Sequence, residues 1–373
     1  MDPRQPGRDW RFGLVMGGGG LRGLAHVGAL RALEQRNWIP ADVVGVSMGA
    51  LVAASWAVGF AVDEIQSMAV SIRRRDIFRI AHSDMAFKRM QSPALYRFEP
   101  LENLVRGLVG EVTFGELPRP LLIATVDINS GTYTIFGLPG TERVRVLDAV
   151  MASCALPGFF PPREIDGRFY VDGALVDNLP ARLAAARGWN GVVAVDVGAT
   201  SVLRADTQDE GFAAVFLRAT EIVFQQAMER HLAAWSGPPL LLVQPRVEHI
   251  PIFSFDKARE LIAEGERATR QALDQAGEAV RSAAGGIHPQ RLVQVKVNRD
   301  RCTGCGACVA LAPQGMFRLD GEGKAVGPDQ PLRWSPVDGS FIRHCPTWAI
   351  TARPAAAGAS TDGATTGTGR DSS

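Results

Sequence analysis

The sequence predicts an α/β protein in which a layered domain with a largely parallel sheet is followed by a smaller domain of strands and turns. Strand-like and helix-like segments alternate over the first 285 residues. The apolar runs at 121–126 and 191–196 are continuous, as in strands that are buried on both faces. After the Ala-Ala-Gly-Gly break at 283–286 the composition changes to strand and turn residues around a cysteine cluster.

The elements of the first domain follow from hydrophobic periodicity. We expect strands at 12–16, 41–44, 121–126, 191–196 and 240–245, and helices at 24–36, 48–62, 210–235 and 256–281. The predicted domains are 1–285 and 286–352. Residues 353–373 contain almost no large apolar side chain, so we expect a disordered tail there.

Composition narrows the class of protein. Of the 373 residues, 46% are hydrophobic and 21% are charged, as in a globular protein with an ample core. The net charge of +1 gives no general attraction to nucleic acid, so no nucleic-acid partner is expected. The N-terminal residues lack an apolar leader, and four of the five cysteines are clustered late in the chain, between 302 and 345. We therefore predict a reducing, cytoplasmic location.

Two glycine-rich motifs point to acyl transfer. Gly45-Val46-Ser47-Met48-Gly49 lies between a predicted strand and a predicted helix, where a serine hydroxyl can be exposed at a tight turn. The glycine run 17–20 offers backbone N–H groups that could hold an oxyanion. Each motif has a simpler interpretation, a tight turn for the first and a dinucleotide site for the second. Against the dinucleotide site, 38–40 is Trp-Ile-Pro and supplies no acidic residue.

A serine nucleophile needs a base, and Asp172 is the best candidate. It ends a short strand and is followed by the small residues Gly173 and Ala174, which leave its carboxylate at a sheet edge. Among the histidines, we interpret His26 as structural and expect neither His231 nor His249 to be the base. Ser153 is a rival nucleophile, but it lacks glycine neighbours. Cys154, beside it, is expected to be a buried thiol.

Three motifs together resemble the patatin-like phospholipases: 18–23, 45–49 and 172–174, in the family's order. The segment 152–162 is also similar, and the resemblance covers about residues 10–275. It implies a lipid acyl-ester hydrolase of the phospholipase A or lysophospholipase type, with no metal or cofactor at the hydrolase site. It also implies the following roles: Ser47 as nucleophile, Asp172 as general base, the amides of Gly18, Gly19 and Gly20 as the oxyanion hole with help from Arg22, and Gly23, Gly45, Gly49, Gly173 and Ala174 as motif residues.

The cysteine cluster has a different chemistry. Cys302, Cys305 and Cys308 form a C-x2-C-x2-C run, and Cys345 precedes a proline much later. Four thiolates could hold zinc, but the triple run with a terminal Cys-Pro favours iron–sulfur. The segment at about 292–350 resembles the bacterial-type ferredoxins, and Ala312 stands where the two-cluster form has a further cysteine. The resemblance therefore implies an α+β domain that holds one [4Fe–4S] cluster, with [3Fe–4S] as the alternative.

Residues 71–99 are basic, with apolar side chains interleaved at Met85, Phe87, Met90 and Leu95. This segment is either a lid or membrane-surface patch that would place the protein peripherally at a membrane, or a solvated helical face. We favour the solvated face.

Together these observations predict a patatin-like hydrolase of lipid esters fused to an iron–sulfur module. We hypothesise that the module senses redox state or oxygen and biases the hydrolase domain, in which case a redox partner is possible. The alternative is an electron-transfer or redox-interaction protein whose patatin-like domain only binds an acyl ligand. An intact Ser47 and Asp172 favour the hydrolase. A third possibility is that the cluster only stabilises the fold and has no redox role.

Overall fold

A computed structural model describes residues 10–79, 94–198 and 211–355. The chain divides into two compact units, residues 1–288 and 289–373, and each is described by itself. The predicted tail lies almost entirely outside the described residues. Within the described ranges, no helix is long and apolar enough to cross a membrane.

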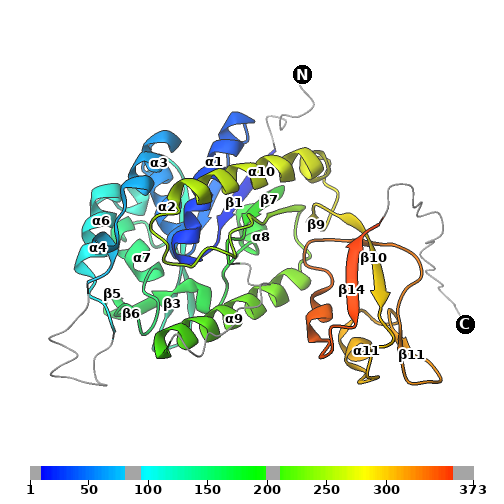
Figure 1. The fold of residues 1–373 in the computed structure, drawn as a ribbon. Coiled ribbons are helices and arrows are strands. Elements are labelled where there is room, and N and C mark those ends of the chain that lie inside the picture. Colours follow the sequence, from blue (N-terminus) through cyan, green and yellow to red (C-terminus); the bar gives the residue numbers. More distant parts are fainter. Residues whose placement is uncertain (1–9, 80–93, 199–210, 356–373) are drawn as a thin grey trace, which may run out of the picture. The chain divides into compact units, whose positions relative to one another are not determined.

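The first unit is built on a nine-stranded sheet, counted over the described residues (Figure 1). The strand order is β5-β6-β3-β2-β1-β7-β8-β9, with β4 also paired to β3. The five pairings from β3 through β9 are parallel, while β4, β5 and β6 form an antiparallel edge. The strands are β1 (Phe12–Met16), β2 (Asp42–Gly45), β3 (Leu121–Asp127), β4 (Tyr133–Phe136), β5 (Arg163–Ile165), β6 (Arg168–Asp172), β7 (Gly191–Val195), β8 (Leu240–Val243) and β9 (Ile287–His288). The predicted α/β class with a largely parallel sheet is confirmed.

Helices pack around this sheet. They are α1 (Ala25–Gln35), α2 (Met48–Ala57), α3 (Val62–Ser71), α4 (Arg74–Ile77), α6 (Glu99–Val109), α7 (Val146–Ser153), α8 (Leu183–Arg187), α9 (Phe212–Ala233) and α10 (Ala258–Arg281), with 3-10 turns η1 (Gly20–Leu24), η3 (Phe114–Glu116) and η4 (Gly173–Leu175). Helices α1 and α10 lie so close that a Cβ on Gly28 would be 1.9 Å from the Ile262 carbonyl oxygen.

The helix expected at 48–62 is two helices. The first, α2, ends at Ala57, and Gly59 follows with φ of +114°, a conformation that residues with side chains rarely adopt. The second, α3, begins at Val62. The sequence prediction missed this turn because the apolar pattern continues across it, and a single glycine does not interrupt hydrophobic periodicity.

The second unit contains an antiparallel sheet of order β13-β10-β14, formed by β10 (Arg291–Val297), β13 (Leu332–Trp334) and β14 (Ile350–Pro354). A two-stranded pair, β11 (Arg318–Leu319) and β12 (Ala325–Val326), the short helix α11 (Ala307–Leu311) and the turn η6 (Ser340–His344) complete it. The boundary between the units falls at 288/289 rather than at 285/286, because β9 pairs with β8 in the large sheet.

Candidate active site and cysteine-lined cavity

Ser47 occupies a strained turn between β2 and α2. Its φ is +53°, which a non-glycine residue adopts only where the surrounding structure imposes it. The flanking glycines explain the imposed conformation. A Cβ on Gly45 would lie 2.3 Å from the Ala50 Cα, and one on Gly49 would lie 2.2 Å from the Met16 carbonyl oxygen. The Gly-x-Ser-x-Gly spacing is therefore a packing requirement of this turn.

Ser153, the rival nucleophile, supports Ser47. Its hydroxyl oxygen accepts the Ser47 N–H at 2.8 Å and donates to the Ala124 carbonyl oxygen at 2.8 Å. The side chain is completely buried at the end of α7, so no substrate can reach it. Ser153 thus joins the serine turn to β3, a role that its sequence context did not indicate.

Asp172 ends β6 beside Ser47. Its carboxylate is 2% exposed and accepts the Ala174 N–H at 3.0 Å. Burial raises the pKa of Asp172 to about 6, although hydrogen bonds from the Ala174 N–H and the Ser47 hydroxyl act to lower it. A Cβ on Gly173 would be 2.5 Å from the Ala124 carbonyl oxygen, so glycine is needed for this close approach. A carboxylate with this pKa can accept a proton near neutral pH.

The glycine loop before η1 is held by Asn178. The Asn178 Oδ1 accepts the Gly18 N–H at 2.8 Å, and its amide donates to the Gly18 carbonyl oxygen at 3.1 Å. The Gly18 N–H, expected to face an oxyanion, is therefore already bonded in this structure. Within the described residues, the N–H groups of Gly19 and Gly20 donate to no acceptor. Sequence analysis missed Asn178, which lies 160 residues from its partner.

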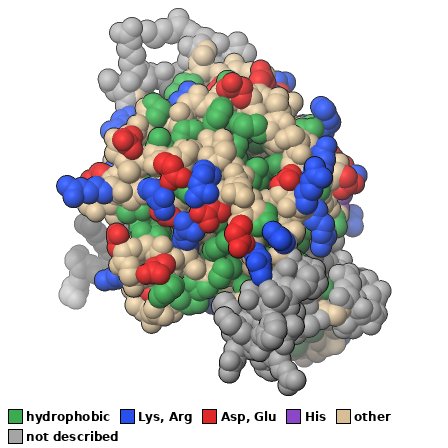
Figure 2. Space-filling view, turned by 90° about the vertical axis from the view of Figure 1, so that its left-hand side faces the viewer, with side chains coloured by type: hydrophobic (Ala, Val, Ile, Leu, Met, Phe, Trp, Pro, Cys, Tyr) green, Lys and Arg blue, Asp and Glu red, His purple; other side chains and the backbone are tan. Residues whose placement is uncertain are grey.

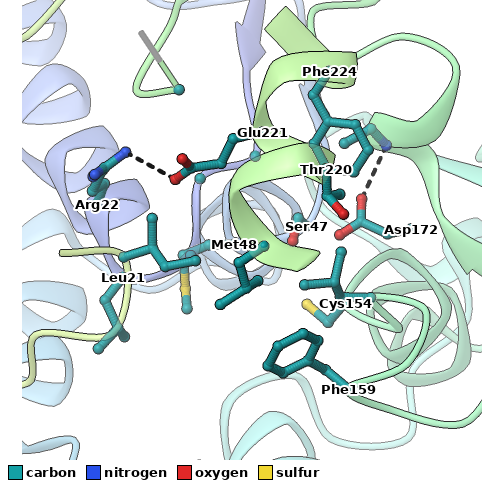
Figure 3. Close-up of a pocket in the computed structure, with 18 of the residues that line it drawn as sticks. Leu21, Arg22, Ser47, Met48, Cys154, Phe159, Asp172, Thr220, Glu221 and Phe224 are labelled. Carbon is teal, nitrogen blue, oxygen red and sulfur yellow. Dashed lines mark hydrogen bonds and ion pairs between the residues drawn. The ribbon is translucent and has the colours of Figure 1, made fainter. Parts of the chain in front are cut away.

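Arg22 is buried rather than turned toward Ser47. Its Nε donates to the Ile250 carbonyl oxygen at 2.6 Å, and its Nη1 lies 3.6 Å from the Glu221 carboxylate of α9. Figure 3 shows this ion pair on the opposite side of the cavity from Asp172. The guanidinium thus ties η1 to α9 and to the segment after β8. The Gly23 motif position is also explained, since a Cβ there would lie 2.6 Å from the Met48 Cγ.

None of the three histidines considered from the sequence lies at the cavity, and each contacts another part of the protein. His26 is completely buried, and its Nε2 lies 2.7 Å from the Gly17 carbonyl oxygen, so the ring steadies the glycine loop. Burial lowers the pKa of His26 to about 4, which keeps the ring neutral. His231 pairs with Asp177 and His249 with Glu260. None of the three lies among the residues that line the cavity at Ser47.

A cavity of about 1090 Å³, including its open mouth, surrounds Ser47 and Asp172 (Figure 3). Its walls are mostly apolar, and α9 contributes one side through Leu217, Thr220, Phe224 and Met228. Cys154, expected to be a buried thiol, is partly exposed and lines this cavity. The protein atoms around its sulfur still remove most hydration, and this desolvation, together with the charge of Asp172, raises the pKa of the thiol. The remaining apolar lining comprises Leu21, Met48, Leu51, Ile77, Phe78, Leu101, Leu156, Phe159, Phe160, Ala174, Ile252 and Phe253.

The basic segment 71–99 is described only in part, since 80–93 lies outside the described residues. In the described part, Arg73, Arg74 and Arg75 are exposed while Ile72 and Ile77 are buried. This portion therefore places exposed basic side chains over an apolar core, an arrangement that fits either interpretation of the segment. Phe78, at its end, reaches the cavity around Ser47.

In the second unit, all four predicted ligand cysteines line one small cavity, together with Thr303, Gly304, Gly306, Ala307, Leu319, Ala325, Thr347, Ala349 and Ile350. Gly304 and Gly306 have φ of +72° and +75°, which lets the loop curl around the cavity. Across the described residues, no three cysteine, histidine or acidic side chains converge as ligands of a single ion.

Backbone N–H groups point at two of these sulfur atoms. The Ala325 N–H lies 3.4 Å from the Cys302 Sγ, and the Ala349 N–H lies 3.3 Å from the Cys345 Sγ. Burial acts to raise the pKa of Cys345, but hydrogen bonds from the Ala349 and Thr347 backbone and nearby groups lower it overall. Thiolates are the form that binds iron, so these donors fit an iron–sulfur cluster.

Fold and site together define an α/β domain with a serine at a strand-to-helix turn, and a small domain with a cysteine-lined cavity. Residues 14–185 match the family described as "Patatin-like phospholipase", and residues 295–339 match the "4Fe-4S single cluster domain". The first unit therefore contains a domain of the patatin-like phospholipase family, and the second a 4Fe-4S single cluster domain. Cys345 lies beyond the matched residues, yet it lines the same cavity as the other three cysteines.

Curated relatives agree with the first assignment. An uncharacterised NTE family protein of Mycobacterium tuberculosis is 30% identical over 226 residues, which cover 60% of this chain and 60% of that protein. Lysophospholipase NTE1 of Candida albicans is 31% identical over 189 residues, which cover 50% of this chain and 13% of that one. The chain thus spans 60% of the length of the first relative and 13% of the length of the second. Among solved structures, VipD of Legionella pneumophila has a TM-score of 0.42 at 15% identity and covers 72% of this chain and 67% of that one.

Proposed function

We propose that the first unit hydrolyses carboxylic esters of lipids through Ser47 and Asp172. The observation that carries the proposal is the pairing of a partly exposed, strained serine with a buried carboxylate whose pKa is raised to about 6, at one mostly apolar cavity. The apolar walls suit an acyl chain, and the family supplies lipid esters as the substrate class.

The reaction follows from these groups. The Asp172 carboxylate takes the proton of the Ser47 hydroxyl while the serine oxygen attacks the ester carbonyl carbon. The carbonyl oxygen becomes an oxyanion that the free N–H groups of Gly19 and Gly20 can bind. The intermediate then expels the alcohol, which takes the proton back from Asp172 and leaves an acyl group on Ser47. Water, deprotonated by Asp172, releases the acid. Gly18 and Arg22, which also line the cavity, help to hold the loop through their hydrogen bonds to Asn178 and Ile250.

The test is hydrolysis of p-nitrophenyl butanoate and of a lysophospholipid by the full chain. Ser47→Ala should lower kcat/KM by at least about 10³-fold, because the nucleophile is absent. Ser153→Ala is the matched control, since it removes a neighbouring hydroxyl that only positions Ser47. Its kcat/KM should fall far less. Equal activity of wild type and Ser47→Ala would refute the proposal and favour a domain that only binds an acyl ligand.

For the second unit we propose one [4Fe–4S] cluster on Cys302, Cys305, Cys308 and Cys345. When bound, such a cluster supplies one-electron redox chemistry. The proposal that it regulates the hydrolase rests on the fusion of the two domains in one chain. Turnover of the ester should then differ by about fivefold between oxidised and reduced protein, within the range of ordinary allosteric coupling. Equal turnover in the oxidised, reduced and cluster-free forms would contradict it.

A further inference from the structure

A second apolar cavity shares a wall with the cavity around Ser47. It measures about 770 Å³, including its open mouth, and lies among η1, α1, α2, α3 and α6. Two side chains, Met48 and Leu51, line both cavities. The other residues that line the second cavity are Leu24, Val27, Val52, Ser55, Ile65, Met68, Ala69, Ser71, Ile72, Asn103, Leu104, Gly107 and Leu108.

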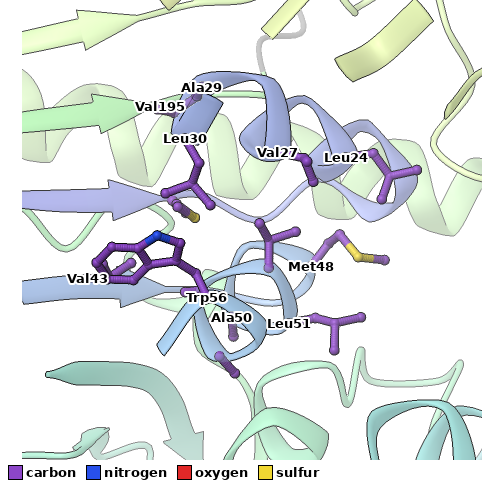
Figure 4. Close-up of a cluster of buried hydrophobic side chains, with 14 of the residues drawn as sticks. Leu24, Val27, Ala29, Leu30, Val43, Met48, Ala50, Leu51, Trp56 and Val195 are labelled. Atoms are coloured by element: carbon purple, nitrogen blue, oxygen red, sulfur yellow. The ribbon is translucent and has the colours of Figure 1, made fainter. Parts of the chain in front are cut away.

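The shared wall begins at the nucleophile. Met48 follows Ser47 directly, and Leu51 lies three residues further along α2, a rise of about 4.5 Å at 1.5 Å per residue. Figure 4 shows Met48 near Leu24 and Val27 on one side and Leu51 on the other. Met48 has an unbranched side chain with three rotatable bonds, so it can swing aside without a change in the backbone.

The lining suits an alkyl chain. No charged side chain is among the residues lining this cavity in the described part of the chain. Ser55 also lines this cavity, but its hydroxyl group donates a hydrogen bond to the Leu51 carbonyl oxygen at 2.9 Å. Figure 2 shows hydrophobic side chains among acidic and basic ones on the side of the molecule that lies at the left in Figure 1, where α3 and α6 are found.

We propose that the second cavity receives the distal part of a long acyl chain whose ester lies at Ser47, with Met48 and Leu51 forming the passage. This inference rests on the proposed function and adds a chain-length preference to it. The occupant follows from proximity: Met48 and Leu51 line both cavities, and Met48 directly follows Ser47, so an acyl chain that starts at Ser47 would enter the second cavity past these two apolar side chains. Long-chain esters are then the preferred substrates, because each additional buried methylene favours binding by about fourfold.

Gly107 gives a way to fill the cavity without disturbing Ser47. It lies on the stripe of α6 that lines the cavity with Asn103, Leu104 and Leu108, and a Cβ there would meet nothing within 4 Å. Gly107→Leu adds an isobutyl group to the cavity, while Gly107→Ala changes the same helix position and leaves the cavity open. Gly285→Leu is a control outside the cavity, because a Cβ at Gly285 also meets nothing within 4 Å.

The measurement is kcat/KM of the full chain for p-nitrophenyl butanoate and hexadecanoate at one fixed detergent concentration. Relative to Gly107→Ala, Gly107→Leu should lower the value for hexadecanoate by about 15-fold, the loss of two methylene contacts, and leave butanoate within about twofold. Gly285→Leu should change neither. An unchanged hexadecanoate-to-butanoate ratio in an active Gly107→Leu variant would overturn the inference alone. A wild type without Ser47-dependent butanoate hydrolysis would overturn the proposed function and this inference with it.

Discussion

The cavity around Ser47 and the cavity lined by the cysteines are assembled in different ways. The first depends on contacts between distant parts of the chain: Gly18 with Asn178, 160 residues apart, and Ser47 with Ser153, 106 residues apart. The second depends on a short loop, since three of its four cysteines lie within 302–308. One site is positioned by the whole fold, and the other by a few residues.

The cores of the two units differ in the same sense. The sheet of the first unit carries an extensive apolar core, whereas the buried core cluster of the second unit has Cys302 and Cys308 among its members. A small domain whose ligands are part of its core gains much of its folding free energy when the metal binds. The comparison leads us to expect that the serine site is organised in advance by protein contacts, while the cysteine site depends on the cluster proposed for it.

The largest expected effect comes from Asp172→Asn. We expect kcat/KM for p-nitrophenyl butanoate to fall by at least about 10³-fold, because the amide cannot accept the Ser47 proton. The protein should remain folded. At pH 8 it should be more stable than wild type by up to about 3 kcal/mol, since the variant no longer buries a charge whose pKa is raised to about 6. Activity assays and urea unfolding measure both, and full activity of the variant would show that another group is the base.

A smaller loss is expected from Asn178→Ala. This variant removes both hydrogen bonds that hold Gly18, so the N–H groups of Gly19 and Gly20 lose their fixed positions. Misplacement of such donors by about 1 Å typically costs about 10²-fold in rate. The loss should appear in kcat rather than in KM, because the loop acts on the transition state. A variant with unchanged kcat would mean that the loop is held well enough by other contacts, such as His26 to Gly17.

The pH profile gives a graded effect. The base must be deprotonated to act, and burial raises the pKa of Asp172 to about 6. We therefore expect kcat/KM to rise about tenfold per pH unit below 6 and to level off above it. His26, with a pKa lowered to about 4, should contribute no step near neutral pH. A plateau that extends unchanged from pH 7 to pH 4 would contradict this assignment.

The smallest expected effect on the first unit comes from removing iron from the second. Chelation should unfold residues 289–355, seen as lost near-UV circular dichroism from Trp334 and its aromatic neighbours, because the ligands belong to the core of that unit. The urea midpoint of the first unit should stay the same, since its own core does not depend on the cluster. If the second unit keeps its circular dichroism signal after iron is removed, its fold does not depend on the cluster, and the contrast drawn between the two sites is wrong.

Sequence reasoning predicted the features that depend on local pattern. The strand 12–16, the glycines beside Ser47 and the small residues after Asp172 are local features, and their spacing carries the information. Features that depend on distant partners were missed: the bond between Asn178 and Gly18, the support that Ser153 gives to Ser47, and the withdrawal of Arg22 toward Glu221. No residue adjacent to Asn178 or Ser153 signals these contacts, because their partners come from other strands and helices.

Covalent labelling tests the central claim most directly. The full chain, purified with its cluster, would be treated with a long-chain alkyl fluorophosphonate, and the modified residue would be located by peptide mass spectrometry. Ser47 is partly exposed and lines the cavity, whereas Ser153 is buried, so the account expects one adduct, on Ser47. It should be lost in Asp172→Asn, where the base is absent. An adduct on any other residue, or no adduct on active protein, would contradict the account.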